Sequence, residues 1–327
     1  MLDARAPSTR ACYATKWRAF RSWCQAGDLD PFQCPLPQVL AYLQSLYVGG
    51  SAASTVKVHA AAIAAYHVSW DGETVLSSRA GALFLKGVAR ARPPSRPLVP
   101  SWDLGVVLEM LSRPPYEPLA AAGISYLSFK TAFLLAMSTA LRVSDMCGFS
   151  IQDGCLVLQE DLSQVVLRPN PAFVGKSGPL VRIEPVVLHS FPPPDVVGRE
   201  ELCLVCPVRA LSLYLDRTST FRGPTLQLLV CYGGPRKGQA LSSEGLSTWL
   251  QRVISASLGP GERDGVRAHS TRGVAASVAL LRGVSVPDIC RAARWGSART
   301  FARFYRMDMA SDSFSRAVLC SAPSGSR

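Results

Sequence analysis

Four residues in the C-terminal third of the chain could act together on one substrate: His269, Arg272, Trp295 and Tyr305. His269 and Arg272 stand three residues apart at the expected start of a helix, so both side chains can face the same point. Histidine can accept a proton, and the arginine guanidinium binds phosphate through a planar, bidentate fork. A lone histidine at a helix start can equally bond the backbone while the arginine lies in solvent, so both interpretations stay open at this point.

Two other segments carry polar groups in apolar surroundings. In STALRVSD, Arg142 follows a long apolar run, where a guanidinium is costly to bury unless it is paired. Asp145 could hold it, which is also a purely structural explanation. In FARFYRMD, the residues Phe301, Phe304 and Tyr305 share one helical face. A core stripe explains the phenylalanines, but the tyrosine hydroxyl needs a partner if it is buried.

The charge of the chain favours a polyanionic partner. The 327 residues carry 35 Lys and Arg against 23 Asp and Glu, a formal net charge of +12. Only six of the basic residues are lysine, and the other 29 are arginine, which matches the geometry of phosphate. Nucleic acid is therefore the expected partner, although solubility alone also explains a basic composition.

Several other classes of protein do not fit the sequence. We predict no secretory signal in MLDARAPSTR, and no apolar run approaches the about 18 residues that cross a membrane. The ten cysteines are then expected to be reduced. Cys203 and Cys206 form a CxxC pair, but Cys231 is distant and has no histidine beside it, so we expect no metal site and no cofactor. Cys206-Pro207 more simply opens a helix.

Residues 1–96 are expected to form a small helical bundle. Ser8 is predicted to cap the first helix, in which Tyr13, Trp17 and Phe20 recur at helical spacing. Further helices are predicted over 36–47, 54–70 and 78–91. The bundle holds eleven basic and five acidic residues, so it could contact nucleic acid or present only a solvated basic face. The proline-rich segment that follows is predicted to be an extended linker.

The remainder is expected to be mostly helical with a small β-sheet, which makes the fold class α+β. Helices are predicted over 101–111, 125–141, 207–217 and 242–258, the last with Ser242 or Ser243 as its cap. Short strands are predicted over 155–160, 164–168, 181–188 and 226–232. The segment that begins at His269 is predicted to form three helices, with boundaries near Gly283 and Gly296.

Taken together, the motifs resemble those of the tyrosine recombinases, the phage-integrase family. That family has an arginine in a Leu-Arg-x-Ser-Glu/Asp motif, a hairpin lysine, His-x-x-Arg, His or Trp, and then tyrosine. The same order runs here through Arg142, Lys176, His269, Arg272, Trp295 and Tyr305. The gaps of 26 residues from histidine to tryptophan and of ten from tryptophan to tyrosine also match. The segments RPNPAFVGK, HSTRGVA and WGSARTFARFYR are most similar to those of recombinases from eukaryotic mobile elements, such as DIRS-type retrotransposons and their relatives.

The resemblance implies metal-independent strand transfer on DNA. Tyr305 would attack a phosphate to give a 3′-phosphotyrosyl enzyme, and His269 would accept its proton, since a phenol ordinarily ionises near pH 10. Arg142 and Arg272 would neutralise the transition state, and Trp295 would offer its indole N–H to the phosphate. Asp145 would orient Arg142 or His269. The covalent intermediate would conserve the energy of the broken bond, so the free hydroxyl of another strand could attack it and rejoin the DNA.

Within the resemblance, one catalytic role has two candidate residues and one motif position differs from the family pattern. The family lysine protonates the 5′-oxygen that leaves; Lys176, in the turn GKSG, fits that place, and Lys237, in GGPRKGQ, is the alternative. Ala140 stands where the family often has glycine. Neither departure removes a catalytic group from the sequence.

The resemblance also implies a domain plan and partners. Residues 1–92 would form a helical core-binding domain, 93–100 the linker and 101–327 the catalytic domain. The basic residues expected to contact double-stranded DNA are Lys16, Arg18, Arg21, Lys57, Lys86 and Arg90. A homo-tetramer on two DNA sites is expected, to which the segment after Tyr305 could contribute. Action in the nucleus is expected only from the resemblance to recombinases of eukaryotic elements, since no basic run resembles a nuclear import signal.

Two other interpretations remain. The chain could be a transposon-derived DNA-binding protein that no longer cuts, although such a relic tends to lose site residues. It could also be a type IB topoisomerase, which shares the chemistry but works without joining two sites. The short bundle and the proline-rich linker resemble integrases more.

Overall fold

The computed structural model describes residues 5–93, 101–175, 184–192, 198, 200–259 and 266–307. Contacts between Cα atoms divide the chain into two compact units, Met1–Arg96 and Pro97–Arg327. The division falls inside the proline-rich segment 93–100, most of which lies outside the described residues. The predicted docking segment after Tyr305 also lies outside them, from residue 308 onward.

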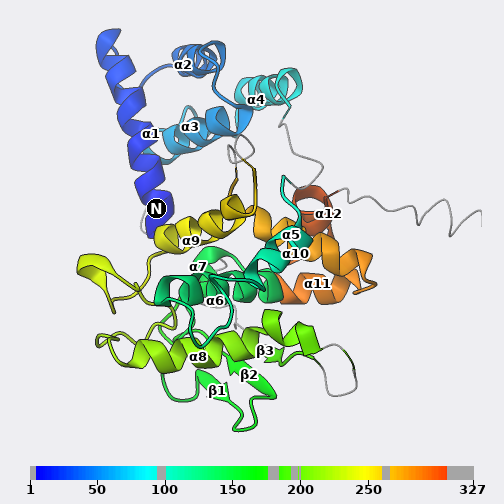
Figure 1. Cartoon of the computed structure of the whole chain (residues 1–327). Helices are drawn as coiled ribbons and strands as arrows, with labels where there is room; N and C mark the ends of the chain where they lie inside the picture. Colours follow the sequence, from blue (N-terminus) through cyan, green and yellow to red (C-terminus); the bar gives the residue numbers. More distant parts are fainter. Residues whose placement is uncertain are drawn as a thin grey trace, which may run out of the picture. The chain divides into compact units, whose positions relative to one another are not determined.

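The N-terminal unit is a helical bundle of α1 (Pro7–Ala26), α2 (Leu36–Val48), α3 (Ala53–Tyr66) and α4 (Arg79–Ala91) (Figure 1). Helix α1 packs mainly on α3, and both bury the apolar side chains that recur at helical spacing. Trp17 stacks on Tyr66 with ring centroids 5.0 Å apart, and Tyr42 donates to or accepts from His59 at 2.9 Å in the core. Gly49 ends α2, and the Ser78 hydroxyl caps α4.

Two of the expected helix boundaries in this unit are wrong. Helix α1 begins at Pro7, whose missing N–H and fixed φ suit the first helical position, so Ser8 lies inside the first turn and caps nothing. Helix α3 ends at Tyr66 rather than at residue 70, because His67 turns to extended backbone and its ring bonds the Cys34 carbonyl.

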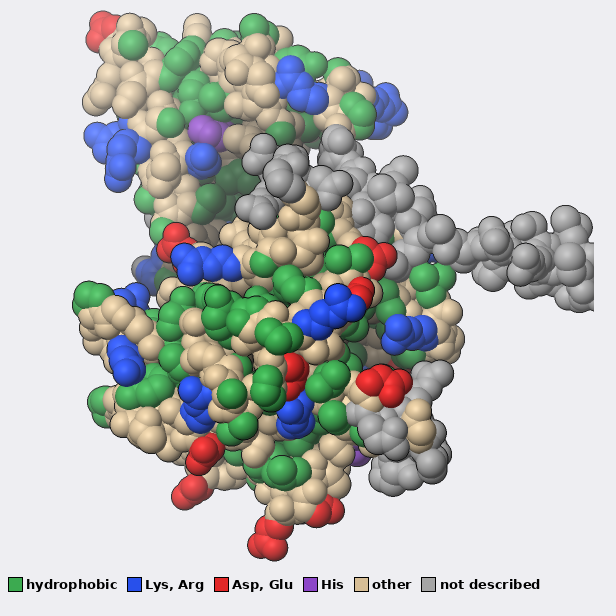
Figure 2. Space-filling model, in the orientation of Figure 1, with side chains coloured by type: hydrophobic (Ala, Val, Ile, Leu, Met, Phe, Trp, Pro, Cys, Tyr) green, Lys and Arg blue, Asp and Glu red, His purple; other side chains and the backbone are tan. Residues whose placement is uncertain are grey.

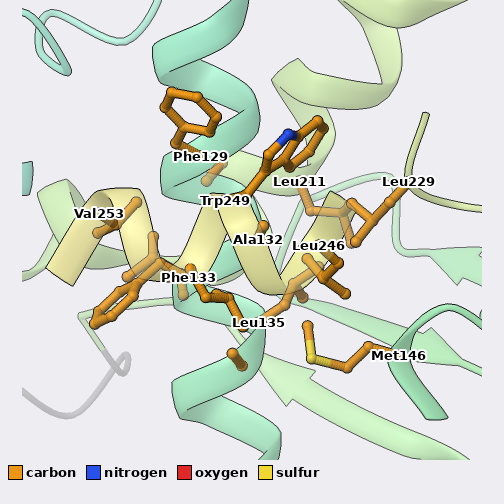
Figure 3. Packing of buried hydrophobic residues seen from close by; sticks show 14 of the residues in the cluster. Phe129, Ala132, Phe133, Leu135, Met146, Leu211, Leu229, Leu246, Trp249 and Val253 are labelled. Carbon is orange, nitrogen blue, oxygen red and sulfur yellow. The ribbon is translucent and has the colours of Figure 1, made fainter. Parts of the chain in front are cut away.

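The second unit is built around α6 (Ile124–Thr139), which is buried on nearly all sides. Helices α8 (Pro207–Ser219), α9 (Ser243–Ala256) and α10 (Ser270–Leu281) pack against it. Figure 3 shows Phe129, Phe133 and Leu135 of α6 in one cluster with Leu211 of α8 and Trp249 of α9. The helices α5 (Leu104–Leu111) and α7 (Val143–Met146) flank this core, and Cys206 and Ser242 cap α8 and α9.

One buried ion cluster accompanies this core. The Lys130 ammonium, on α6, donates to Glu117 at 2.6 Å and to the Leu111 carbonyl at 2.7 Å. Arg209 of α8 binds the same carboxylate through two nitrogens, at 2.9 and 3.1 Å. These three side chains satisfy one another, and this is why a lysine can be fully buried in an apolar helix.

A small sheet adjoins α8. Among the described residues it has three antiparallel strands in the order β1 (Leu156–Leu158), β2 (Gln164–Leu167) and β3 (Val186–His189). Val165 and Leu167 face the core, as the alternating pattern predicts. The expected strand over 226–232 is wrong: this segment makes only isolated bridges, Ser150 with Gln227 and Val230 with Ala240. Leu228, Leu229 and Val230 are nevertheless buried in the core of this unit, whereas Leu226 is exposed.

The chain then forms α10, α11 (Val286–Ala292) and α12 (Ala298–Phe304), which lie next to one another (Figure 1). Their boundaries at Gly283 and Gly296 are as predicted. The fold class is therefore the expected one, mostly helical with a small sheet. Within the described residues, no helix has the length and apolar character to cross a membrane.

Candidate active site

Tyr305 and His269 meet although 36 residues separate them. His269 lies directly before α10 and Tyr305 directly after α12, so both side chains project from helix ends. The Tyr305 hydroxyl is 3.1 Å from His269 Nε2, and the tautomer of the imidazole decides which atom donates. His269 is exposed and Tyr305 is half-buried, so an external group can reach the pair. The geometry suits proton transfer between phenol and imidazole.

Arg272 lies one turn into α10 and is almost completely buried, with 1% of its surface exposed. Its Nη2 donates to the Ala293 carbonyl at 2.9 Å, while Nε and Nη1 have no hydrogen-bond partner in the described part of the chain. Burial lowers the pKa of Arg272 to about 10; Tyr305 and Asp145 act in the opposite direction, and Arg142 adds to the decrease. A buried cation with two unpaired donors is costly, and an anion would satisfy it.

Trp295 closes the site from the turn between α11 and α12. Its ring stacks on Tyr305, with centroids 4.4 Å apart, and on Phe301 at 5.5 Å. The Arg272 guanidinium lies 5.2 Å from the ring centroids of both Trp295 and Tyr305. Like two donors of Arg272, the buried indole Nε1 is unpaired within the described residues. Three buried donors thus lie beside the Tyr305 ring.

Arg142 enters from α6 through a tight turn. Ala140 ends α6 in the left-handed conformation with φ +49°, a position that favours glycine, and Arg142 then opens α7. Arg142 Nη1 is 3.6 Å from Asp145 Oδ2, which is an ion pair rather than a close hydrogen bond. The charges of Arg142 and Asp145 act in opposite directions on the pKa of Arg272.

The structure describes only one of the two candidate lysines, Lys176 and Lys237. Lys176 lies outside the described residues. Lys237 is exposed, and its Nζ lies 4.7 Å over the ring of Phe221, which is not part of the cluster around Tyr305.

Two residues that the sequence interpretation missed seat Tyr305 on α10. Ser277 Oγ accepts the Met307 N–H at 2.9 Å and donates to the Tyr305 carbonyl at 3.4 Å. At Gly273 an added Cβ would meet that carbonyl oxygen at 3.2 Å. His269, Gly273 and Ser277 are spaced four apart and form one stripe of α10. A histidine followed by small residues at this spacing was the available signal.

The six basic residues expected to contact DNA lie in the N-terminal unit. Lys16, Arg18 and Arg21 are on α1, Lys57 is on α3, and Lys86 and Arg90 are on α4; all are exposed except Lys16, which is half-buried. The pKa of His59 is lowered by burial and, secondarily, by the Lys16 charge. On the face of this unit seen in Figure 2, blue basic side chains are more abundant than red acidic ones.

In the described residues, no group of three or more His, Cys, Asp or Glu side chains could hold a metal ion. Cys206 instead accepts the N–H groups of Phe191 and Arg209 through its sulfur at 3.3 and 3.4 Å.

Comparison with known proteins identifies the fold. No protein-family model matches the sequence, and neither does any curated protein. Among solved structures, the chain is similar to the XerH site-specific recombinase bound to palindromic difH substrate, with a TM-score of 0.59, 15% identity, and coverage of 90% of this chain and 76% of that one. It is also similar to a lambda integrase dimer bound to a COC′ core site (0.56, 15%, 94% and 75%). For the Tn1549 transposon integrase in complex with transposon right end DNA, the values are 0.54, 12%, 87% and 86%. The chain therefore has the fold of these site-specific recombinases and integrases.

Proposed function

We propose that this protein cuts and rejoins double-stranded DNA as a tyrosine recombinase, with Tyr305 as the nucleophile. The observation that carries the proposal is the Tyr305 hydroxyl 3.1 Å from His269, beside a buried Arg272 whose Nε and Nη1 have no hydrogen-bond partner among the described residues. A tyrosine with a proton acceptor and an anion-binding guanidinium is what attack on a phosphodiester needs. The fold shared with recombinases and integrases adds independent support.

Tyr305 Oη bonds to phosphorus, its proton passes to His269, and the bond from phosphorus to the 5′-oxygen breaks. The products are a 3′-phosphotyrosyl link and a 5′-hydroxyl, whose proton comes from Lys176 by resemblance or from Lys237 as the alternative. Arg142, Arg272 and the Trp295 indole N–H would stabilise the charge on the non-bridging oxygens. Attack by a 5′-hydroxyl on the same phosphorus reverses the step and rejoins the DNA.

Asp145 would act as the shared counter-ion of the arginines. It is 4% exposed, pairs with Arg142 at 3.6 Å and raises the pKa of Arg272. Without a carboxylate there, the two guanidinium groups would repel each other before DNA binds.

The domain plan follows the same proposal. Residues 1–92 would bind DNA as a core-binding domain through Lys16, Arg18, Arg21, Lys57, Lys86 and Arg90. Residues 93–100 would link it to the catalytic domain, 101–327. A homo-tetramer on two DNA sites is proposed by analogy with the lambda integrase tetramer bound to a Holliday junction. The protein would act in the integration of a eukaryotic mobile element, such as a DIRS-type retrotransposon, and in the nucleus. Both parts of this proposal rest on the sequence resemblance alone.

Covalent trapping tests the proposal. Purified protein is mixed with supercoiled DNA and with fragments of its own genomic flanks in EDTA, then denatured in SDS. We expect a protein–DNA adduct with wild type and none with Tyr305→Phe, which keeps the ring stacked on Trp295 but removes the attacking oxygen. An adduct that persists in Tyr305→Phe would assign the nucleophile to another residue. DNA binding without any adduct would favour a DNA-binding protein that no longer cuts, and adducts independent of a second site would favour a topoisomerase.

A further inference from the structure

Helix α11 ends in a turn that normally selects glycine but contains an arginine. The Trp295 N–H donates to the Cys290 carbonyl at 2.8 Å, and the Arg294 N–H donates to Arg291 at 3.1 Å. This pair of bonds is the Schellman motif, in which the residue at the position of Arg294 is left-handed and usually glycine. Arg294 has φ +55°. A residue other than glycine that keeps a left-handed backbone is expected to have side-chain contacts that hold it there.

The Arg294 side chain makes such contacts. Its Nη2 donates at 3.0 Å to the carbonyl of Glu184, two residues before β3 begins, so it connects the α11–α12 turn to the segment that enters the sheet. Burial lowers the pKa of Arg294, and the charges of Asp145 and Glu184 partly offset that decrease. Asp145 is the carboxylate that also pairs with Arg142 and acts on Arg272. Asp145 therefore acts electrostatically on Arg272 and Arg294 in addition to pairing with Arg142.

The residues on either side of Arg294 both contact the active site. The Ala293 carbonyl accepts the bond from Arg272 Nη2 at 2.9 Å, and Trp295 stacks on Tyr305. A rotation of this turn would change the direction of the Arg272 guanidinium and the place of the tyrosine ring together. The bond from Arg294 to Glu184 holds the turn against such a rotation. Within the described residues, it is the only hydrogen bond from the Arg294 side chain to the segment at β3.

We propose that Arg294 is a positioning residue for strand transfer: it fixes the α11–α12 turn to the start of β3, so that Ala293 and Trp295 hold Arg272 and Tyr305 in register. This inference rests on the proposed function. It concerns a residue that touches neither the phosphate nor the attacking oxygen.

Replacing Arg294 with glycine separates the two properties of this residue. Arg294→Gly removes the guanidinium but relaxes the left-handed backbone, so the fold should be kept. We expect adduct formation at saturating DNA to slow by about tenfold, the scale of a misplacement of about half an ångström. DNA affinity should stay unchanged, and Arg294→Lys, which keeps a cationic donor, should recover part of the rate. Added methylguanidinium should also restore part of the rate in Arg294→Gly but not in wild type.

Asp71→Gly is the matched control, because Asp71 is an exposed left-handed residue with φ +50° in the other unit. If Arg294→Gly does not fold, Arg294→Asn gives the same comparison, since asparagine tolerates this conformation. An Arg294→Gly rate equal to wild type would overturn the inference and leave the proposed function intact. A wild type that forms no adduct in the same gel would remove both. A loss that neither lysine nor methylguanidinium relieves would make Arg294 a structural residue only.

Discussion

The contact between α10 and the backbone of Tyr305 yields a prediction whose size can be worked from the structure. In Gly273→Ala, the new Cβ would lie 2.6 Å from Met307 Cε and 3.2 Å from the Tyr305 carbonyl oxygen. The methionine methyl can swing away. The carbonyl cannot do so alone, because it is backbone and is bonded to Ser277 on the same helix. Ordinary contact begins near 3.4 Å, so Tyr305 must move outward.

The expected effect on catalysis follows from that movement. A misplacement of about 1 Å costs about a hundredfold in rate, so a shift of about 0.2 to 0.4 Å predicts about a three- to sixfold slower reaction. Stability should not fall with it, because alanine in a helix interior is favoured over glycine by about 1 kcal/mol, which offsets the crowding. Gly273→Ala should therefore lose activity while keeping its thermal midpoint.

Single-turnover adduct formation on trapped DNA, at saturating protein, measures this rate directly. Met307→Ala is the control, and the double variant Gly273→Ala/Met307→Ala tells which contact matters. If the Tyr305 carbonyl is the obstacle, the double variant stays slow. A rate in Gly273→Ala equal to wild type would refute the view that close approach of α10 and Tyr305 sets the geometry. Full recovery in the double variant would assign the effect to Met307 instead.

Three further predictions concern other parts of the chain. Glu117→Gln leaves the Lys130 ammonium buried without its counter-ion and should destabilise the fold by about 3 to 5 kcal/mol in urea unfolding; a change below about 1 kcal/mol would contradict the buried pairing. Because burial lowers the pKa of His59 below its ordinary 6.5, the unfolded chain binds the proton first, and stability should be full above that pH and fall as the pH decreases. His59→Gln should flatten this decrease between pH 7.5 and 5, and a decrease of unchanged steepness would assign it to other groups. Lys86→Ala and Arg90→Ala should each make the fall of log affinity for DNA with log salt concentration less steep, by about 1 in the slope. An unchanged slope would exclude that side chain from phosphate contact.

Local sequence alone predicted most of the secondary structure. Apolar residues at helical spacing marked the helices of both units, and alternation marked the strands of the small sheet. Prediction failed where a local pattern is ambiguous. Ser8 is a good cap, but Pro7 starts the helix. The run 226–232 resembles a strand, yet among the described residues it makes only isolated bridges, because an apolar run predicts burial without specifying whether strands or helices cover it.

The sequence also gave the types and order of the candidate site residues, since these are features of the chain itself. Only the tertiary structure decided that His269, Arg272, Trp295 and Tyr305 lie together. His269 and Tyr305 come from the ends of different helices, and nothing local fixes the 3.1 Å between them. Burial of Arg272, with two donors unpaired in the part of the chain that the structure describes, depends on helices distant in the chain. The spacing of Gly273 and Ser277 from His269 was visible in the sequence, but their contact with the Tyr305 backbone was not, and nothing in the sequence marked Arg294. The importance of these residues lies in what approaches them, and packing determines that only once the chain has folded.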